Sequence, residues 1–297
     1  DGGGSNAGHV RVYEYDSSNW VQLGADIDGE AADDHSGISV SLAADGTCVA
    51  VGAVYNDGGG TDAGHVRVYE YDSSTWVQLG ADIDGEAAGD ESGWDVALSS
   101  YGTRVAIGAR FNDGGGSNAG HVRVYEYDSS TWVQLGADID GEAAEDNCGW
   151  DVALSSDGSR VAIGARLNDG GGTDAGHVRV YEYDSSTWVQ LGADIDGEAA
   201  GDESGWDVAL SSYGTRVAIG ARFNDGGGSN AGHVRVYEYD SSTWVQLGAD
   251  IDGEAAEDNC GRAVSLSGDG SRVAIGAHNV NSAAGQVRVW QLAYLPS

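Results

Sequence analysis

The chain has few basic residues and almost no proline. Of its 297 residues one is proline and none is methionine, and the 14 basic residues, all arginine, face 48 acidic residues. The formal net charge of −34 disfavours binding to nucleic acid or to an anionic membrane surface, and it favours divalent cations or basic partners. Because proline is so scarce, the turns must be made by the 49 glycines and by Asn, Asp and Ser.

Long apolar runs are also lacking, so the sequence predicts no membrane span. The first residues do not have the pattern of a signal peptide, and Asp1–Val10 repeats Asp113–Val122 letter for letter, so we expect a fragment of a longer repeat protein. The 3 cysteines, an odd number, define no disulfide framework. Cys148 and Cys260 occupy equivalent positions two repeats apart, too far for an internal bridge, and either stay free or bond to a neighbouring molecule.

A tandem repeat dominates the sequence. The segment AGHVRVYEYDSS recurs every 56 residues, starting at Ala7, Ala63, Ala119, Ala175 and Ala231. An altered copy, AGQVRVWQL, starts at Ala284. Repeats of this length indicate a solenoid, an array or a propeller.

Each repeat contains four runs with the pattern of β-strands. In the first repeat that is complete on both sides they are Gly93–Leu98, Arg104–Ala109, His121–Tyr127 and Thr131–Ile139. Short turn signals separate the runs, and no segment shows a helical period. Four strands with tight turns are typical of a propeller blade.

The strand count predicts an all-β, five-bladed β-propeller that forms a single domain over residues 1–297. In this prediction the last blade takes its two inner strands from Gly261–Ala277 and its outer strand from Trp20–Ile27, so the two ends of the chain share one sheet. One copy of the third strand, His9–Tyr15 or Gln286–Leu292, is then surplus. An open solenoid with capped ends is the alternative.

The segment Ser92–Tyr127 resembles the FG-GAP repeat, the blade unit also found in the head of integrin α chains. The residues that match that pattern are Gly93, Val96, Ala97, Val105, Ile107, Gly108, Ala109, Gly120, Val122, Val124 and Tyr125. The resemblance implies an extracellular or cell-surface protein that serves in adhesion or ligand binding. The family's calcium loop does not carry over, because the connection after the first strand is only SSYG or SSDG and holds at most one acid.

An acidic motif, GADIDGEAA, occurs five times without a change. Two interpretations stay open: a solvated turn that serves solubility, or a weak calcium site on one face of the disc. The candidate calcium ligands are Asp82, Asp84, Glu86, Asp138, Asp140, Glu142, Asp194, Asp196 and Glu198.

One histidine per repeat, for example His121, begins the third strand. We expect these side chains to be polar strand ends and not metal ligands, because strands far from the axis cannot bring them together. No catalytic constellation or cofactor fingerprint is present, and identical repeats offer no unique pocket. The sequence therefore favours a non-enzymatic structural or adhesive protein that self-associates into an array or fibre. The alternatives are a calcium-dependent protein- or glycan-binding propeller and, with less support, an enzyme using the central channel.

The C-terminal copy of the third strand is more apolar than the others. An open strand edge is a template for pairing with another chain, so this segment is the expected assembly contact. Its candidate residues are Gln286, Val287, Val289, Trp290, Leu292 and Tyr294.

Overall fold

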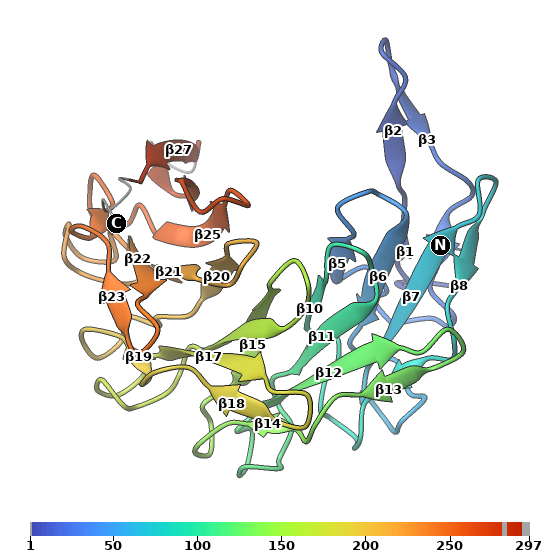
Figure 1. Ribbon diagram of the computed structural model, residues 1–297, viewed down its shortest axis with the longest axis horizontal. Helices are drawn as coiled ribbons and strands as arrows, with labels where there is room; N and C mark the ends of the chain where they lie inside the picture. Colours follow the sequence, from blue (N-terminus) through green and yellow to red (C-terminus); the bar gives the residue numbers. More distant parts are fainter. Residues whose placement is uncertain (1, 281–283, 293–297) are drawn as a thin grey trace.

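The computed structural model describes residues 2–280 and 284–292 (Figure 1). The regular structure in these residues is β-strand apart from one helical residue, Val280. No helix in this part of the chain is long and apolar enough to cross a membrane. The prediction of an all-β tandem repeat is confirmed.

Each of four repeats forms its own five-stranded sheet, with the same arrangement of strands. The first contains β5 (Ser39–Leu42), β6 (Cys48–Ala53), β7 (His65–Tyr71), β8 (Trp76–Gln78) and β9 (Ile83–Asp84). The second contains β10 (Asp95–Leu98), β11 (Arg104–Ala109), β12 (His121–Tyr127), β13 (Trp132–Gln134) and β14 (Ile139–Asp140). The third contains β15 (Cys148–Leu154), β16 (Arg160–Ala165), β17 (His177–Tyr183), β18 (Trp188–Gln190) and β19 (Ile195–Asp196). The fourth contains β20 (Asp207–Leu210), β21 (Arg216–Ala221), β22 (His233–Tyr239), β23 (Trp244–Gln246) and β24 (Ile251–Asp252).

Within each of these sheets the strands are antiparallel and follow the order of the sequence. The predicted fourth strand is split in two, so that β13 and β14 pair with different parts of β12. The connection between the first two strands is short, as between Leu98 and Arg104, in agreement with the turn signals of the sequence.

The two ends of the chain form incomplete sheets. At the N-terminal end, β1 (His9–Val10) pairs with β4 (Ile27–Asp28), and β2 (Tyr13–Tyr15) pairs with β3 (Trp20–Gln22). At the C-terminal end, β25 (Cys260–Leu266), β26 (Arg272–Ala277) and β27 (Gln286–Gln291) make a three-stranded sheet.

The predicted closed ring is therefore wrong for the described residues, and the five-blade count that rested on closure is not confirmed. Figure 1 shows the sheets following one another along an open arc, with the β25–β27 sheet and the N-terminal strands at opposite ends. Each surplus copy of the third strand has paired with its neighbour in sequence, β2 with β3 and β27 with β26. Such local hairpins cost less loop-closure entropy than a sheet that joins the two ends of the chain.

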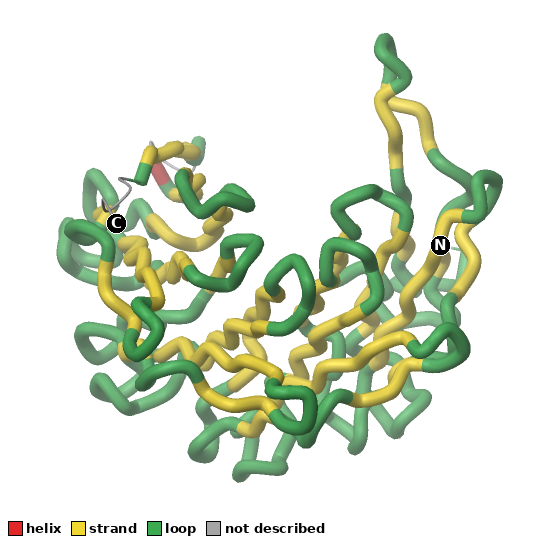
Figure 2. Tube along the Cα trace, in the orientation of Figure 1, coloured by secondary structure: helices red, strands yellow, loops and turns green. Residues whose placement is uncertain are grey.

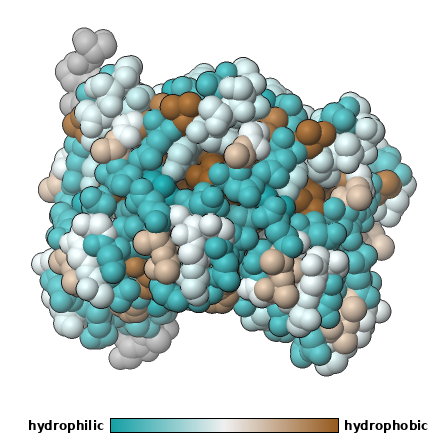
Figure 3. Space-filling view, turned by 90° about the horizontal axis from the view of Figure 1, so that it is seen from below, coloured by the Kyte–Doolittle hydropathy of each residue, from teal (hydrophilic) through white to brown (hydrophobic). Residues whose placement is uncertain are grey.

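The core lies between successive sheets. The face of one sheet that carries Val66 and Val68 packs against Ile107, Tyr125 and Trp132 of the next sheet. The first strands β5, β10, β15, β20 and β25 contact one another in turn along the inner side of the arc (Figure 2). Seen from below in Figure 3, the surface of the arc is mostly hydrophilic with small hydrophobic patches.

Candidate functional sites

A cluster of two carboxylates and one histidine recurs at four junctions between repeats. In each cluster the ligand-type atoms lie within 4.8 Å of one another. The four clusters are Glu30–His65–Asp82, Glu86–His121–Asp138, Glu142–His177–Asp194 and Glu198–His233–Asp250.

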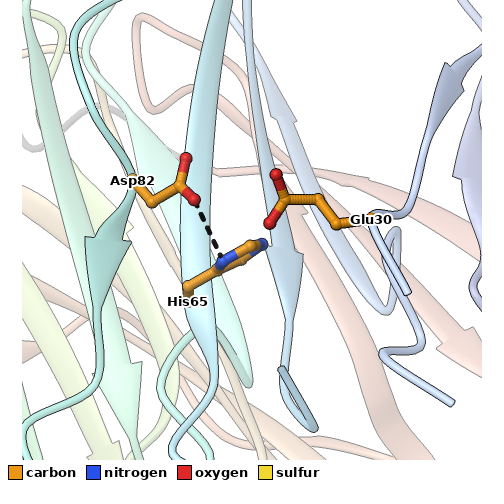
Figure 4. Close-up of side chains that lie close together, drawn as sticks. All are labelled: Glu30, His65 and Asp82. Atoms are coloured by element: carbon orange, nitrogen blue, oxygen red, sulfur yellow. Dashed lines mark ion pairs between the residues drawn. The ribbon is translucent and has the colours of Figure 1, made fainter. Parts of the chain in front are cut away.

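Figure 4 shows how Glu30 and Asp82 approach the imidazole of His65 from its two sides. His65 begins β7, Asp82 precedes β9 of the same repeat, and Glu30 follows β4 in the preceding repeat. The Nδ1 atom of His65 lies 3.7 Å from Oδ2 of Asp82. The imidazole is buried, whereas Glu30 is exposed and Asp82 is partly buried. Each cluster thus has a buried nitrogen at its base and carboxylates toward the solvent.

Neighbouring side chains hold the two carboxylates in place. Gln134 Nε2 donates a 2.6 Å hydrogen bond to Oδ1 of Asp138, and Arg123 Nη1 lies 3.6 Å from Oε1 of Glu86. The other oxygen of Glu86, Oε2, faces Nδ1 of His121 at 3.9 Å. One oxygen of Glu86 is therefore paired with arginine while the other is directed at the imidazole.

The histidines of these clusters are held in their neutral form. Burial, followed by the charge of the arginine two residues along the strand, lowers the pKa of His121 and of His177 to about 4. The same causes lower the pKa of His65 and of His233. Both ring nitrogens of each of these four side chains are buried and have no hydrogen-bond partner.

The structure divides the predicted acidic motif between two clusters. Asp82 joins His65 of its own repeat, whereas Glu86 reaches His121 of the next repeat, and the same split separates Asp138 from Glu142 and Asp194 from Glu198. Asp84, Asp140 and Asp196 are not in these clusters, and their backbone carbonyls accept hydrogen bonds from Arg123, Arg179 and Arg235. Whether any of these acids binds calcium stays a prediction.

The sequence analysis expected these histidines to be polar strand ends and not metal ligands, and it did not foresee that each would meet two carboxylates. That expectation considered one metal ion shared by several histidines. In the structure each histidine instead meets two acids, one from its own repeat and one from the preceding repeat. The available signal was their recurrence, once per repeat, together with the acidic motif.

A second repeated contact joins the outer strands. The indole Nε1 of a tryptophan donates to a leucine carbonyl in the preceding repeat, as Trp76 does to Leu23 at 2.9 Å. The other pairs are Trp132–Leu79, Trp188–Leu135 and Trp244–Leu191. The indole also covers the glycine after that leucine, so a β-carbon built on Gly192 would lie 3.2 Å from Cδ1 of Trp244. These tryptophans are 9% exposed.

Both partners of this contact are left open at the two ends of the arc. Trp20, the equivalent tryptophan of the N-terminal repeat, is 71% exposed. Among the described residues its ring contacts that of Tyr15 in the same hairpin, in a tilted arrangement with the ring centroids 5.6 Å apart. At the other end, no described indole reaches Leu247, and no heavy atom of the described residues lies within 4 Å of a β-carbon built on Gly248. We call the hairpin Tyr13–Gln22 the end hairpin. It projects away from the rest of the arc in Figure 1.

A cavity of about 410 Å³ lies beside Leu247 and Gly248. Its wall includes Ala249, Trp290 and Leu292, so it separates the outer strand of the fourth repeat from β27. We call this cavity the end socket. It occupies the place where an outer strand of the last sheet would lie.

The predicted assembly residues fall into three groups. Val287 and Val289 are 72% and 66% exposed, whereas the equivalent Val122 and Val124 are buried against the next repeat. Gln286 and Trp290 are also exposed. Leu292 is buried in the core of the last repeat, and it also forms part of the wall of the end socket. Whether these residues make an assembly contact stays a prediction. Tyr294 lies outside the described residues.

The inner side of the arc carries a row of carboxyl groups in a groove of about 500 Å³. Asp95 Oδ2 accepts a hydrogen bond of 2.8 Å from the backbone of Val152, and Asp151 makes the same contact with Val208 at 2.7 Å. Burial raises the pKa of Asp95 to about 6 and that of Asp207 to about 7. Burial and the two flanking carboxylates also raise the pKa of Asp151.

The cysteines are buried and unbonded. Cys48, Cys148 and Cys260 are all free. Burial is the main cause that raises the pKa of Cys148 to about 11. The expectation that Cys148 and Cys260 form no internal bridge is confirmed.

No family model matches the chain, and no curated protein is similar to it. A solved structure that resembles it is the Kuenenia stuttgartiensis hydrazine synthase, with a TM-score of 0.58 and 16% sequence identity. The likeness covers 97% of this chain and 79% of that chain. At this identity the likeness shows the fold alone, a propeller-like succession of sheets. The resemblance to FG-GAP repeats stays a prediction.

Proposed function

We propose that this chain is a non-enzymatic structural repeat protein that associates head to tail with further copies of itself. In this assembly the end hairpin of one copy enters the end socket of the next. The observation that carries the proposal is the pair of open partners: Trp20 lacks the leucine carbonyl that every complete repeat offers, and Leu247 lacks the indole.

The internal junctions supply the physical argument. There the tryptophan is only 9% exposed and donates a hydrogen bond to the preceding repeat, whereas the equivalent Trp20 is 71% exposed. Deeply buried tryptophans of this kind are typical hot spots of protein interfaces, where truncation costs about 2 kcal/mol or more. The N-terminal end carries the tryptophan of this contact and the C-terminal end carries the leucine. A second copy of the chain therefore supplies the partner that each end lacks.

The strand edges favour the same partner. The outer edge of β27 carries no further strand among the residues described, and Val287 and Val289, which belong to β27, are exposed. An open edge of this kind binds an added strand through main-chain hydrogen bonds. Because the two contact surfaces differ and lie at opposite ends of the arc, their association is head to tail, and it extends into a fibre where the rotation between copies does not close a ring.

The proposed location of the protein and its proposed class of function are argued from the sequence. We propose an extracellular or cell-surface location and an FG-GAP-like relationship from the blade pattern and the acidic composition. Nearly identical repeats present the same surface several times, which suits multivalent adhesion or scaffolding more than catalysis. Extracellular proteins and glycans are the further partners that such a surface would take.

The proposal is tested with two variants that each disable one end. Trp20→Ala removes the indole and keeps the socket, whereas Ala249→Trp fills the socket at an exposed lining residue and keeps the hairpin. We expect the wild-type protein to form concentration-dependent oligomers in light scattering and each variant to be monomeric. A 1:1 mixture of the variants should give one heterodimer and nothing larger.

Tyr213→Ser provides the matched control, because Tyr213 is 81% exposed and lies outside both contact surfaces. This variant should assemble like the wild type. A wild-type protein that stays monomeric at all concentrations, or a variant mixture that forms no heterodimer, would contradict the proposal.

A further inference from the structure

We propose that the four Glu–His–Asp clusters are binding sites for a divalent transition-metal ion of the Zn²⁺ type. Each site would join two adjacent repeats. The inference is independent of head-to-tail association, because it concerns internal junctions and not the ends of the arc.

The donor set points to this class of ion. Each cluster offers one imidazole nitrogen and two carboxylate oxygens within 4.8 Å of one another. Imidazole with carboxylate is a ligand combination that Zn²⁺ accepts, with three protein ligands and water completing the coordination sphere. Calcium wants six or more oxygen ligands, which two carboxylates and an imidazole do not supply.

In these clusters, neighbouring side chains contact one oxygen of a carboxylate and leave its other oxygen facing the histidine. Gln78 Nε2 donates to Oδ1 of Asp82 at 2.6 Å, so Oδ2 is the oxygen left facing His65. At the fourth junction, Arg235 Nη1 lies 3.8 Å from Oε1 of Glu198, and Oε2 of the same carboxylate lies 3.8 Å from Nδ1 of His233. Partners that orient ligands in this way are a regular feature of metal sites.

The imidazoles are the independent sign of a ligand. His65, His121, His177 and His233 are each 1% exposed, and none of their ring nitrogens has a hydrogen-bond partner. Buried polar atoms in native proteins are nearly always satisfied, so a nitrogen left unpaired at the same place in four repeats calls for an explanation. A metal ion held between the imidazole and the two carboxylates satisfies one nitrogen at each junction.

Among the described residues, the first and last repeats do not contain the complete Glu–His–Asp cluster. His9 is exposed, and Asp26 of that repeat uses both oxygens to accept hydrogen bonds from Arg11 at 2.9 and 2.7 Å. In the last repeat Gln286 stands at the position of the histidine. The proposal therefore specifies four ions per chain, one for each complete cluster.

A bound ion would tie the repeats together. The glutamate comes from the preceding repeat, whereas the histidine and the aspartate come from the following one. Because a ligand that binds only the folded state raises its stability, Zn²⁺ should raise the melting temperature. The stack would then be stiffer in the presence of the metal.

The test is calorimetric titration of metal-depleted protein with Zn²⁺, together with cobalt absorption spectra that report the ligand field. We expect four ions per chain for the wild type, three for His121→Gln and none of these sites for the variant with all four histidines changed to Gln. Thermal stabilisation by Zn²⁺ should disappear in the fourfold variant. Gln is the natural residue at the equivalent position 286, which favours folding of these variants.

His9→Gln is the matched control and should keep four sites. Glu86→Gln supplies a second route that leaves the buried imidazole untouched, since Glu86 is exposed; it should weaken one of the four sites at least about tenfold. If the number of ions bound stays the same in the fourfold variant, the metal is held by surface acids in general and the proposal fails. Failure of the wild type to bind Zn²⁺ would overturn it as well.

Discussion

The indole Nε1 of Trp132 donates a hydrogen bond of 2.8 Å to the backbone carbonyl of Leu79, which belongs to the preceding repeat. The two residues lie far apart in the sequence, and the contact recurs at each junction between complete repeats. It therefore couples the folding of one repeat to that of its neighbour, as expected for a linear array in which each unit contacts only the next.

Loss of this bond should be measurable. Trp132→Phe keeps most of the apolar contact but leaves the carbonyl of Leu79 without the indole. We expect a loss of about 1–2 kcal/mol in the free energy of unfolding, measured with denaturant. Trp20→Phe, at the N-terminal end where the indole has no leucine partner, should leave the stability of the monomer unchanged. Equal losses in the two variants would show that the bond contributes nothing.

The row of carboxyl groups predicts a dependence of stability on pH. The folded pKa of Asp95, about 6, is above its ordinary value, so the folded state holds the proton more tightly than the unfolded state. The stability that this adds is present at pH 4 and is lost as the pH rises to about 6.

Asp95→Asn removes the buried charge and keeps an oxygen for the backbone of Val152. We expect the variant and the wild type to be equally stable near pH 4, and the variant to be more stable at pH 8 by about 2 kcal/mol. Thermal unfolding across this range is the measurement, with exposed Glu14→Gln as the control. A difference that does not change with pH would contradict the assignment.

One glycine in the second strand of each repeat is required by close packing against the next repeat. A β-carbon on Gly108 would overlap the backbone carbonyl of Gly149, and neither backbone can move freely inside a packed core. Gly108→Ala should destabilise the protein by about 1–3 kcal/mol.

Gly276 provides the internal comparison for this position. It is the equivalent glycine of the last repeat, and its β-carbon would be in ordinary van der Waals contact with Ala263, with the nearest described atom, Cβ, at 3.5 Å. Gly276→Ala should therefore be close to neutral in the same denaturant experiment. Similar losses of stability in the two variants would mean that the effect of the substitution comes from the backbone conformation of the glycine and not from the close approach of the next repeat.

The thiols should be unreactive while the protein is folded. Cys148 is fully buried and its raised pKa of about 11 keeps it protonated at pH 8, so little thiolate is available to react. A thiol reagent such as DTNB should label it only after denaturant is added, and mass spectrometry should find no disulfide. Rapid labelling of the native protein would show that the site opens locally.

The repeat pattern alone predicted much of the local structure. The alternation in His121–Tyr127 and the turn residues after Leu98 correspond to strands and turns at the expected places. These features depend on neighbours in the sequence, which is why periodicity and glycine placement sufficed. The split of the fourth strand into β13 and β14 was missed, because nothing in the run Thr131–Ile139 marks the interruption.

By itself, the sequence determined the all-β repeat, its four-stranded unit and its acidity. Only the tertiary structure decided three further points: that the arc stays open, that Trp20 and Leu247 are unmatched partners at its two ends, and that His65 meets Glu30 of another repeat. The physical reason is the same in each case. Identical repeats carry identical local signals, so the sequence cannot tell which copies find a partner. That depends on the stacking of one sheet on the next, which buries a side chain inside the array and leaves its equivalent exposed at the end.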